Sequence, residues 1–222
     1  MRGVTIQIAS IPSREQQLKL TINSLYGQVE QINVFLNGYS YIPEFLNRRW
    51  INVKVLDNST GDAAKFFGVE RLRGYIFTCD DDIIYPSHYV RSTIKKLQGY
   101  NNKVIVTYHG KVFKNRPIKD FYTDPQIKHH YLDRVIRDEY VNIGGTGVMA
   151  WHSSAIKLKY SDFHLPNMAD IHISRVAHKK KIGIICLNHL SNFFGHQETS
   201  SSIYETHLGG CKAQTKECNR FL

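Results

Sequence analysis

Short hydrophobic runs alternate with amphipathic segments along most of the chain. Most of the runs are uninterrupted and rich in β-branched residues, which is typical of strands buried on both faces of a parallel sheet. The segments between them space their apolar residues three or four apart, as helices that cover such a sheet do. The expected strands are 4–9, 31–36, 51–56, 75–79, 104–108, 148–151 and 182–187, and the expected helices are 13–26, 63–70, 88–98 and 168–179, the first three capped by Ser13, Asp62 and Ser87.

This order predicts one α/β domain with a Rossmann-like, three-layer α/β/α architecture and a mixed, mostly parallel sheet. The regular alternation up to about residue 100 indicates a nucleotide-binding half, and the loop-rich 101–198 indicates an acceptor-binding half. We therefore expect a domain over 1–198. From 199 to 222 the chain turns polar, which predicts a mobile or peripheral tail.

The composition changes this picture little. Of the 222 residues, 42% are hydrophobic and 22% charged, which excludes a disordered chain. No apolar run approaches the ~18 residues that span a bilayer, and the first residues lack the apolar segment of a signal peptide. The four cysteines form no Cys-x-x-Cys pair and are expected to be reduced thiols, so we expect a cytoplasmic location.

The charge balance points to anionic partners. Lys and Arg number 29 against 19 Asp and Glu, a formal charge of +10 that attracts nucleic acid, anionic lipid or phosphorylated small molecules. A nucleic-acid-binding domain is an alternative, but the basic residues are scattered, the longest run is 179–181, and no nucleic-acid-binding motif is present. We expect no nucleic-acid partner, and peripheral membrane association stays open.

Three neighbouring aspartates, Asp80, Asp81 and Asp82, directly follow the hydrophobic segment 74–79. Carboxylates this close repel one another unless a cation offsets their charge. The carboxyl ends of strands in open α/β sheets are also where ligands bind. Mg²⁺ and Mn²⁺ favour carboxylate oxygens and keep positions free for substrate phosphates. The cluster therefore predicts a divalent-metal site that bridges to a diphosphate, with a solvated acidic turn as the alternative.

These aspartates, followed by Ile-Ile-Tyr-Pro, resemble the Asp-x-Asp motif of GT-A glycosyltransferases. The similarity is to bacterial heparosan-type capsule N-acetylglucosaminyltransferases and related transferases of large algal viruses. It continues in collinear order through segments 11–14, 24–29, 36–37, 61–66, 109–110, 145–147 and 170–175, and spans about residues 4–190. The resemblance implies a GT-A fold and an enzyme of polysaccharide biosynthesis that moves a sugar from a UDP-sugar to a hydroxyl of a glycan or glycoconjugate.

The resemblance also implies roles for individual residues. Asp80 and Asp82 would bind Mn²⁺ (or Mg²⁺), with His196 as a third ligand and His189 as the other candidate for that position. The segment 144–147 lacks the lysine of a P-loop, and its glycines are expected to leave room for the transferred sugar. The residues expected to contact the UDP-sugar are Ala9, Ser10, Pro12, Arg14, Asn37, Lys65, Asp80, Asp81, His109, Gly145 and Thr146.

Asp170, at the start of the helix expected over 168–179, is the candidate catalytic residue. In many inverting GT-A enzymes a carboxylate in this region deprotonates the acceptor hydroxyl. The heparosan-type relatives retain configuration, and there Asp170 would orient the acceptor or stabilise positive charge on the anomeric carbon. The stereochemical outcome stays open, and a helix N-cap is the structural alternative for this residue.

A metal-dependent nucleotidyltransferase or hydrolase is the second functional alternative. Such an enzyme uses similar carboxylates in a two-metal site. It needs further acidic residues on neighbouring strand ends, and Asp57 and Asp62 are the evident supply.

Overall fold

The computed structural model describes residues 3–199 and 211–222. Its centre is an eight-stranded sheet in the order β3-β2-β1-β4-β11-β6-β12-β9. β3, β2, β1 and β4 are parallel, as are β6 and β12, whereas β11 runs antiparallel to β4 and β6 and β9 runs antiparallel to β12. The strands are β1 (Val4–Ser10), β2 (Gln31–Asn37), β3 (Ile51–Leu56), β4 (Tyr75–Cys79), β6 (Ile105–Thr107), β9 (Glu139–Tyr140), β11 (Val148–His152) and β12 (Ile184–Cys186).

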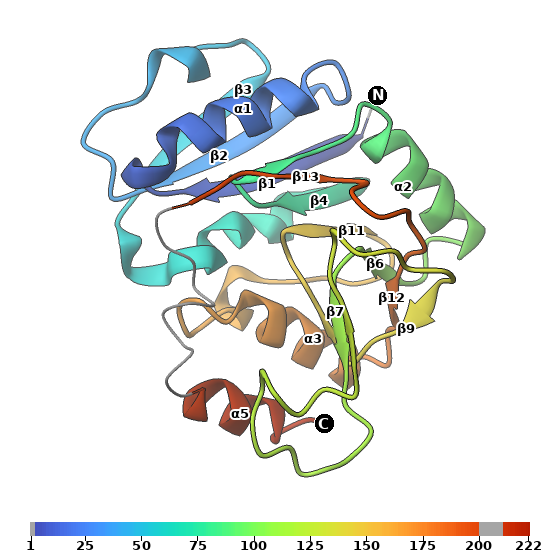
Figure 1. Cartoon of the computed structure of the whole chain (residues 1–222). Coiled ribbons are helices and arrows are strands. Elements are labelled where there is room, and N and C mark those ends of the chain that lie inside the picture. The colour runs from blue at the N-terminus through green and yellow to red at the C-terminus, as the bar shows by residue number, and fades with distance from the viewer. Residues whose placement is uncertain (1–2, 200–210) are drawn as a thin grey trace.

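Helices cover both faces of this sheet (Figure 1). α1 (Glu15–Leu25) and α2 (Tyr89–Gly99) pack on one face, and η3 (Asn58–Phe66) and α3 (Ala169–Lys179) pack on the other. The strands alternate between the two cores: in β11, Val148 and Ala150 join the first, and Met149 and Trp151 join the second. Burial on both faces explains why these strands are uninterrupted hydrophobic runs. The shorter 3₁₀ helices are η1 (Pro12–Arg14), η2 (Glu44–Leu46), η4 (Val69–Arg71) and η5 (Tyr160–Asp162).

Two small sheets extend the domain beside the main one. β10 (Ile143–Gly144), β7 (Gly110–Val112) and β8 (Ile127–His129) form one, and β5 (Ile83–Ile84) pairs with β13 (Gly195–His196) in the other. The β5–β13 pair brings residues after β12 back to the acidic cluster. None of the helices in the described parts of the chain is long and apolar enough to cross a membrane.

The predicted helix caps were wrong. Ser13 lies inside η1, and no side chain caps α1 or α2, so Ser87 caps nothing. Asp62 lies within η3, whose own cap is Asp57. Instead, Asp62 Oδ2 accepts a hydrogen bond (3.2 Å) from the backbone N–H of Ala169, the first residue of α3. A carboxylate distant in sequence therefore caps the N-terminus of α3.

The C-terminal region contains a packed helix that was not predicted from the sequence. Much of the predicted polar tail, residues 200–210, lies outside the described residues. Beyond it, α5 (Lys212–Cys218) packs with Cys218 against a third core that includes Phe113 and Phe121. Asn219 holds this contact, because its side chain accepts from the backbone N–H of Ile118 (2.9 Å) and donates to the carbonyl of Ile118 (2.8 Å). This part of the predicted tail therefore supports the segment that follows β7.

Candidate active site

The ends of β1, β2 and β4 meet at one edge of the sheet because these strands are parallel neighbours. β4 ends at Cys79, and the chain then turns sharply at Asp80. The backbone N–H of Asp80 donates to the Gly147 carbonyl (3.2 Å) and to the hydroxyl of the buried Tyr85 (2.9 Å), and Tyr85 Oη donates to the same carbonyl (2.5 Å). These bonds fix the start of the acidic cluster against β11. The predicted position of the aspartates, at the carboxyl end of a buried strand, is confirmed.

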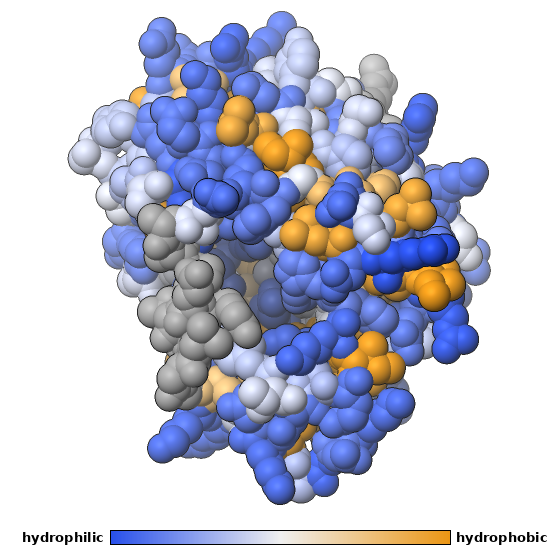
Figure 2. Space-filling model, in the orientation of Figure 1, coloured by the Kyte–Doolittle hydropathy of each residue, from blue (hydrophilic) through white to orange (hydrophobic). Residues whose placement is uncertain are grey.

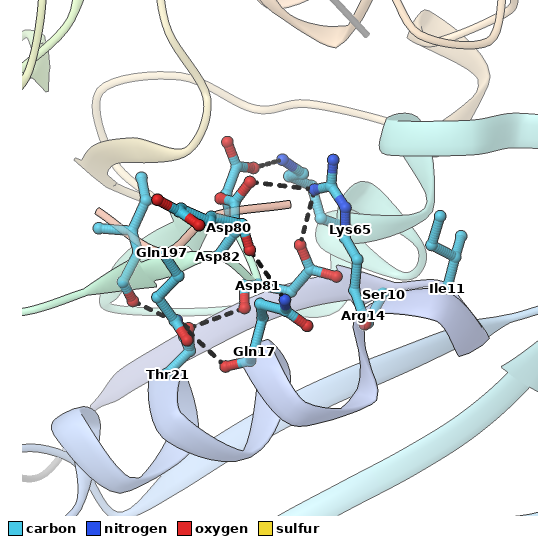
Figure 3. A network of polar contacts seen from close by, with 12 residues as sticks. Ser10, Ile11, Arg14, Gln17, Thr21, Lys65, Asp80, Asp81, Asp82 and Gln197 are labelled. Atoms are coloured by element: carbon cyan, nitrogen blue, oxygen red, sulfur yellow. Dashed lines mark hydrogen bonds and ion pairs between the residues drawn. The ribbon is translucent and has the colours of Figure 1, made fainter. Parts of the chain in front are cut away.

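Two of the three aspartates, Asp81 and Asp82, share Arg14 as a partner, and Asp80 pairs with Lys65 (Figure 3). Asp81 is buried, and its Oδ1 accepts from Arg14 Nη1 at 3.0 Å. The same Arg14 nitrogen lies 3.1 Å from Asp82 Oδ2, while Asp80 forms an ion pair with the ammonium of Lys65. Two cations therefore separate three carboxylates, which reduces the mutual repulsion expected from the sequence.

Lys65 carries a buried ammonium, and only 3% of the residue is exposed. Burial by itself would lower the pKa of Lys65, but Asp80, Asp62 and Asp170 outweigh it and raise the pKa, so the side chain stays charged. These carboxylates come from three separate elements: η3, the turn after β4, and α3. We call Asp62, Asp80, Asp82 and Asp170, together with Lys65, the acidic corner.

Asp170 accepts two hydrogen bonds from one residue. Both the backbone N–H and the Oγ1 of Thr146 lie 2.7 Å from Asp170 Oδ1. Burial raises the pKa of Asp170, and the bonds from Thr146 and the charge of Lys65 counteract this effect in part. Asp170 is the second residue of α3, and the residue at the N-cap position is Met168. The N-cap alternative for Asp170 is therefore wrong.

A cavity of about 880 Å³ opens beside the acidic corner. Figure 2 shows the hollowed face of the molecule and a largely hydrophilic rim around the opening. The predicted site residues divide into two groups. Those lining the cavity are Lys65, Asp80, Asp82, His109, Gly145, Thr146, Asp170 and His196. The others, Ala9, Ser10, Pro12, Arg14, Asn37 and Asp81, lie at the ends of β1, β2 and β4 or in η1, next to this cavity lining rather than in it.

The glycines of segment 144–147 make room for side chains of the protein itself. A Cβ on Gly147 would lie 2.0 Å from Asp80 Oδ2, and a Cβ on Gly145 would lie 2.9 Å from the ring of His109. A larger residue at either position would displace these side chains, and the predicted room for a transferred sugar stays a prediction. The glycines therefore shape the cavity by admitting Asp80 and His109.

The histidines that line the cavity are held by packing and hydrogen bonds. His109 packs beside His130, with ring centroids 5.2 Å apart, and burial lowers the pKa of His109 to about 3, so its ring is neutral. β5–β13 pairing places His196 opposite Ile83, next to Asp82, and His196 Nδ1 lies 2.8 Å from Tyr131 Oη. The other candidate, His189, is buried among aromatic side chains and does not line the cavity.

Four further residues that line the cavity were not predicted from the sequence. They are Lys111 and Lys128, from β7 and β8, together with Phe121 and Tyr122. We call these four residues the basic wall. No local motif marks them, because they are brought together only by strand pairing and by the loop that α5 supports.

The residues of the acidic corner suit a divalent cation. Burial, together with the charges of Asp80 and Asp81, raises the pKa of Asp82 to about 7, and burial raises that of Asp62 to about 7. Carboxylates outnumber the nearby cations Arg14 and Lys65, and a divalent ion would offset this excess. Within 3–199 and 211–222, no three His, Cys, Asp or Glu side chains are close enough to hold a metal by themselves. Asp80 and Asp82 therefore fit an ion that also takes oxygens from a substrate.

Comparison with solved structures supports the fold. Two crystal structures of S. aureus TarS residues 1–349 match the chain, one of them in complex with UDP-GlcNAc. The first has a TM-score of 0.52 at 10% identity and covers 85% of this chain and 58% of that one. The UDP-GlcNAc complex has a TM-score of 0.54 at 8% identity and covers 91% of this chain and 60% of that one.

No protein-family model matches the chain, and no curated protein matches its sequence significantly. The chain spans about three fifths of the TarS chains that it matches. At this identity the similarity concerns the fold alone. The predicted fold class is confirmed: a single α/β domain with a mixed central sheet and the glycosyltransferase fold, GT-A, whereas the likeness to heparosan-type and viral enzymes stays a prediction.

Proposed function

We propose that the chain is a metal-dependent glycosyltransferase that transfers a sugar from a UDP-sugar to a hydroxyl of a glycan or glycoconjugate. One observation supports this most strongly: Asp80 and Asp82, which follow the carboxyl end of β4, line the same cavity as Asp170. The fold is shared with a protein solved in complex with UDP-GlcNAc.

In this proposal the donor lies against the acidic corner. Asp80 and Asp82 would hold Mn²⁺ or Mg²⁺, which when bound offsets the charge of a departing diphosphate. Arg14 and Lys65 keep the carboxylates apart and in place, since each forms an ion pair with the cluster. Ala9, Ser10, Pro12 and Asn37, at the ends of β1 and β2 or just beyond, would receive the nucleoside. Asn37 Oδ1 is buried without a hydrogen-bond partner in the described structure, which suits contact with a base.

The acceptor hydroxyl would approach Asp170. Its Oδ1 is fixed by the two bonds from Thr146, so the orientation of the carboxylate is set before an acceptor arrives. Its raised pKa makes the carboxylate a better proton acceptor than an exposed aspartate. We therefore assign to Asp170 contact with the acceptor, and to Asp80 and Asp82 contact with the donor.

The structure adds little in favour of the nucleotidyltransferase alternative. Of the two further aspartates that it would need, Asp57 is occupied in capping η3. Asp62 lines the cavity, but its Oδ2 caps α3. Only Asp62 Oδ1, which has no hydrogen-bond partner among the described residues, would be available to a second metal.

The decisive test is thermal melting of the whole chain with UDP, with and without Mn²⁺. A ligand that binds only the folded state stabilises it, by about 2.7 kcal/mol at a hundredfold excess over Kd. For a domain of this size we expect a rise of roughly 5–10 °C in Tm that requires Mn²⁺. Asp82→Asn should abolish the rise and the transfer activity, while Glu44→Gln, which neutralises an exposed carboxylate outside the cavity, should change neither. A metal-dependent rise that survives in Asp82→Asn would contradict the assignment.

A further inference from the structure

Two lysines of the basic wall face each other across a strand pair. Lys111 of β7 is directly opposite Lys128 of β8 in an antiparallel register, so both side chains lie on the same face. Like charges in this arrangement destabilise a sheet. Both residues line the cavity, and neither has an ion pair with an acidic residue among those described. A ligand that carries negative charge would relieve the repulsion.

The position of the Lys111 ammonium is fixed by aromatic rings and not by a carboxylate. Its Nζ lies 3.7 Å from the ring centroid of Phe121 and 4.4 Å from that of Tyr122. Cation–π contacts of this kind orient an ammonium without cancelling its charge. The pKa of Lys111 is lowered to about 8, because burial and the charge of Lys128 lower it more than Asp170 raises it. The side chain is therefore still mostly protonated at neutral pH, and it is held at the cavity surface.

The acidic corner and the basic wall line the same cavity and carry opposite net charge. The acidic corner repels an anion that has no metal with it, whereas the basic wall attracts one. Asp170 and Lys111 line the same cavity, and Lys111 pairs with Ile143 of β10, the strand that contacts α3, which carries Asp170. An anionic group bound at the wall would therefore bring a neighbouring hydroxyl toward Asp170.

We propose that Lys111 and Lys128 form an anion subsite for the acceptor, and that the acceptor glycan carries a carboxylate or phosphate group near the hydroxyl that receives the sugar. This inference rests on the proposed function for the identity of the ligand as an acceptor. The anion binding itself can be measured without any transfer reaction. Lys111, which is partly buried and oriented by two rings, contributes more to binding than the exposed Lys128.

The experiment measures binding of three small probes to the whole chain by calorimetry at constant ionic strength. Glucuronate supplies a carboxylate, glycerol 1-phosphate supplies a phosphate, and glucose is the neutral control. Each titration is run with and without UDP and Mn²⁺. We expect at least one anion to bind more tightly than glucose, and Lys111→Met to weaken that binding roughly tenfold, the loss of one charged contact. Lys128→Met should weaken it by less.

Lys95→Met is the matched control, since it removes one positive charge from an exposed position of α2 outside the cavity. Binding of glucuronate alone would assign an acidic sugar to the acceptor, and binding of glycerol 1-phosphate alone would assign a phosphate ester. Anions that bind no better than glucose would overturn the subsite, as would equal losses in Lys111→Met and Lys95→Met. Lys111-dependent anion binding in a chain that does not bind UDP would leave the subsite intact and contradict the proposed glycosyltransferase instead.

Discussion

The acidic corner and the basic wall face one cavity but are built in opposite ways. The corner takes Asp80 and Asp82 from a single turn after a buried strand, and ion pairs to Arg14 and Lys65 hold that turn. The wall takes its two lysines from paired strands of a small sheet, and α5 supports the adjoining loop from the far end of the chain. The proposed donor side is therefore fixed by the central sheet, whereas the proposed acceptor side depends on peripheral packing. A substitution on one side should leave the other side largely unchanged.

The largest effect is expected where the two regions meet. Asp170→Asn keeps an oxygen that can accept from Thr146 but removes the charge that would receive a proton. We expect turnover to fall about 100-fold or more, within the range of general-base contributions. The Kd for UDP in the presence of Mn²⁺, measured from the rise in Tm, should stay within about a factor of two of the wild-type value. Kinetics and melting on the same preparation check this. Equal losses of turnover and UDP affinity would assign Asp170 to the donor side.

A smaller effect should separate the wall from the corner. Asn219→Ala removes both hydrogen bonds that hold Ile118 to the C-terminal helix region and should cost about 1–3 kcal/mol of unfolding free energy. It should raise the KM for the acceptor without weakening UDP binding, because the loop carrying Phe121 and Tyr122 loosens. Lys216→Ala, on an exposed position of α5, is the control and should be neutral. If UDP binding weakened as much as acceptor binding in Asn219→Ala, the two sides would not be independent.

The smallest predicted effect concerns pH, to which two residues that line the cavity, Asp62 and His109, should respond in opposite directions. The folded-state pKa of Asp62 is raised to about 7, so the stability associated with its protonated form is present below about pH 4 and is lost as pH rises through 7. The folded-state pKa of His109 is lowered to about 3, so its contribution is complete above about pH 6.5 and is lost as pH falls toward 3.

Each group can change the slope by at most about 1.4 kcal/mol per pH unit. Asp62→Asn should therefore remove the fall in stability that this group contributes as pH rises from about 4 to 7, and His109→Gln should remove the fall that the imidazole contributes as pH decreases from about 6.5 toward 3. Urea unfolding from pH 4 to 8 measures both slopes. Identical pH profiles for wild type and either variant would show that the group titrates alike in the folded and unfolded states.

Much of the framework was predictable from local patterns. The seven expected strands all form, and their ends differ from the prediction by at most two residues, because continuous β-branched runs have few alternatives to a buried strand. Two of the predicted caps were wrong for different reasons: Ser13 lies in a 3₁₀ turn, and Asp62 bonds to a helix that begins more than a hundred residues later. The predicted cytoplasmic location, the halves of the domain, the metal and the ligands of UDP stay predictions.

The sheet, its two hydrophobic faces and the acidic turn at its edge follow from local sequence, because each depends on contiguous residues that alternate between two faces or on one short motif. Which charges face one another depends on the folded chain. Lys111 meets Lys128 through a strand register, Gly147 admits Asp80 through a close approach of two turns, and Asp62 reaches α3 across the chain. Such contacts depend on distances between residues far apart in sequence, and no local pattern encodes a distance of that kind.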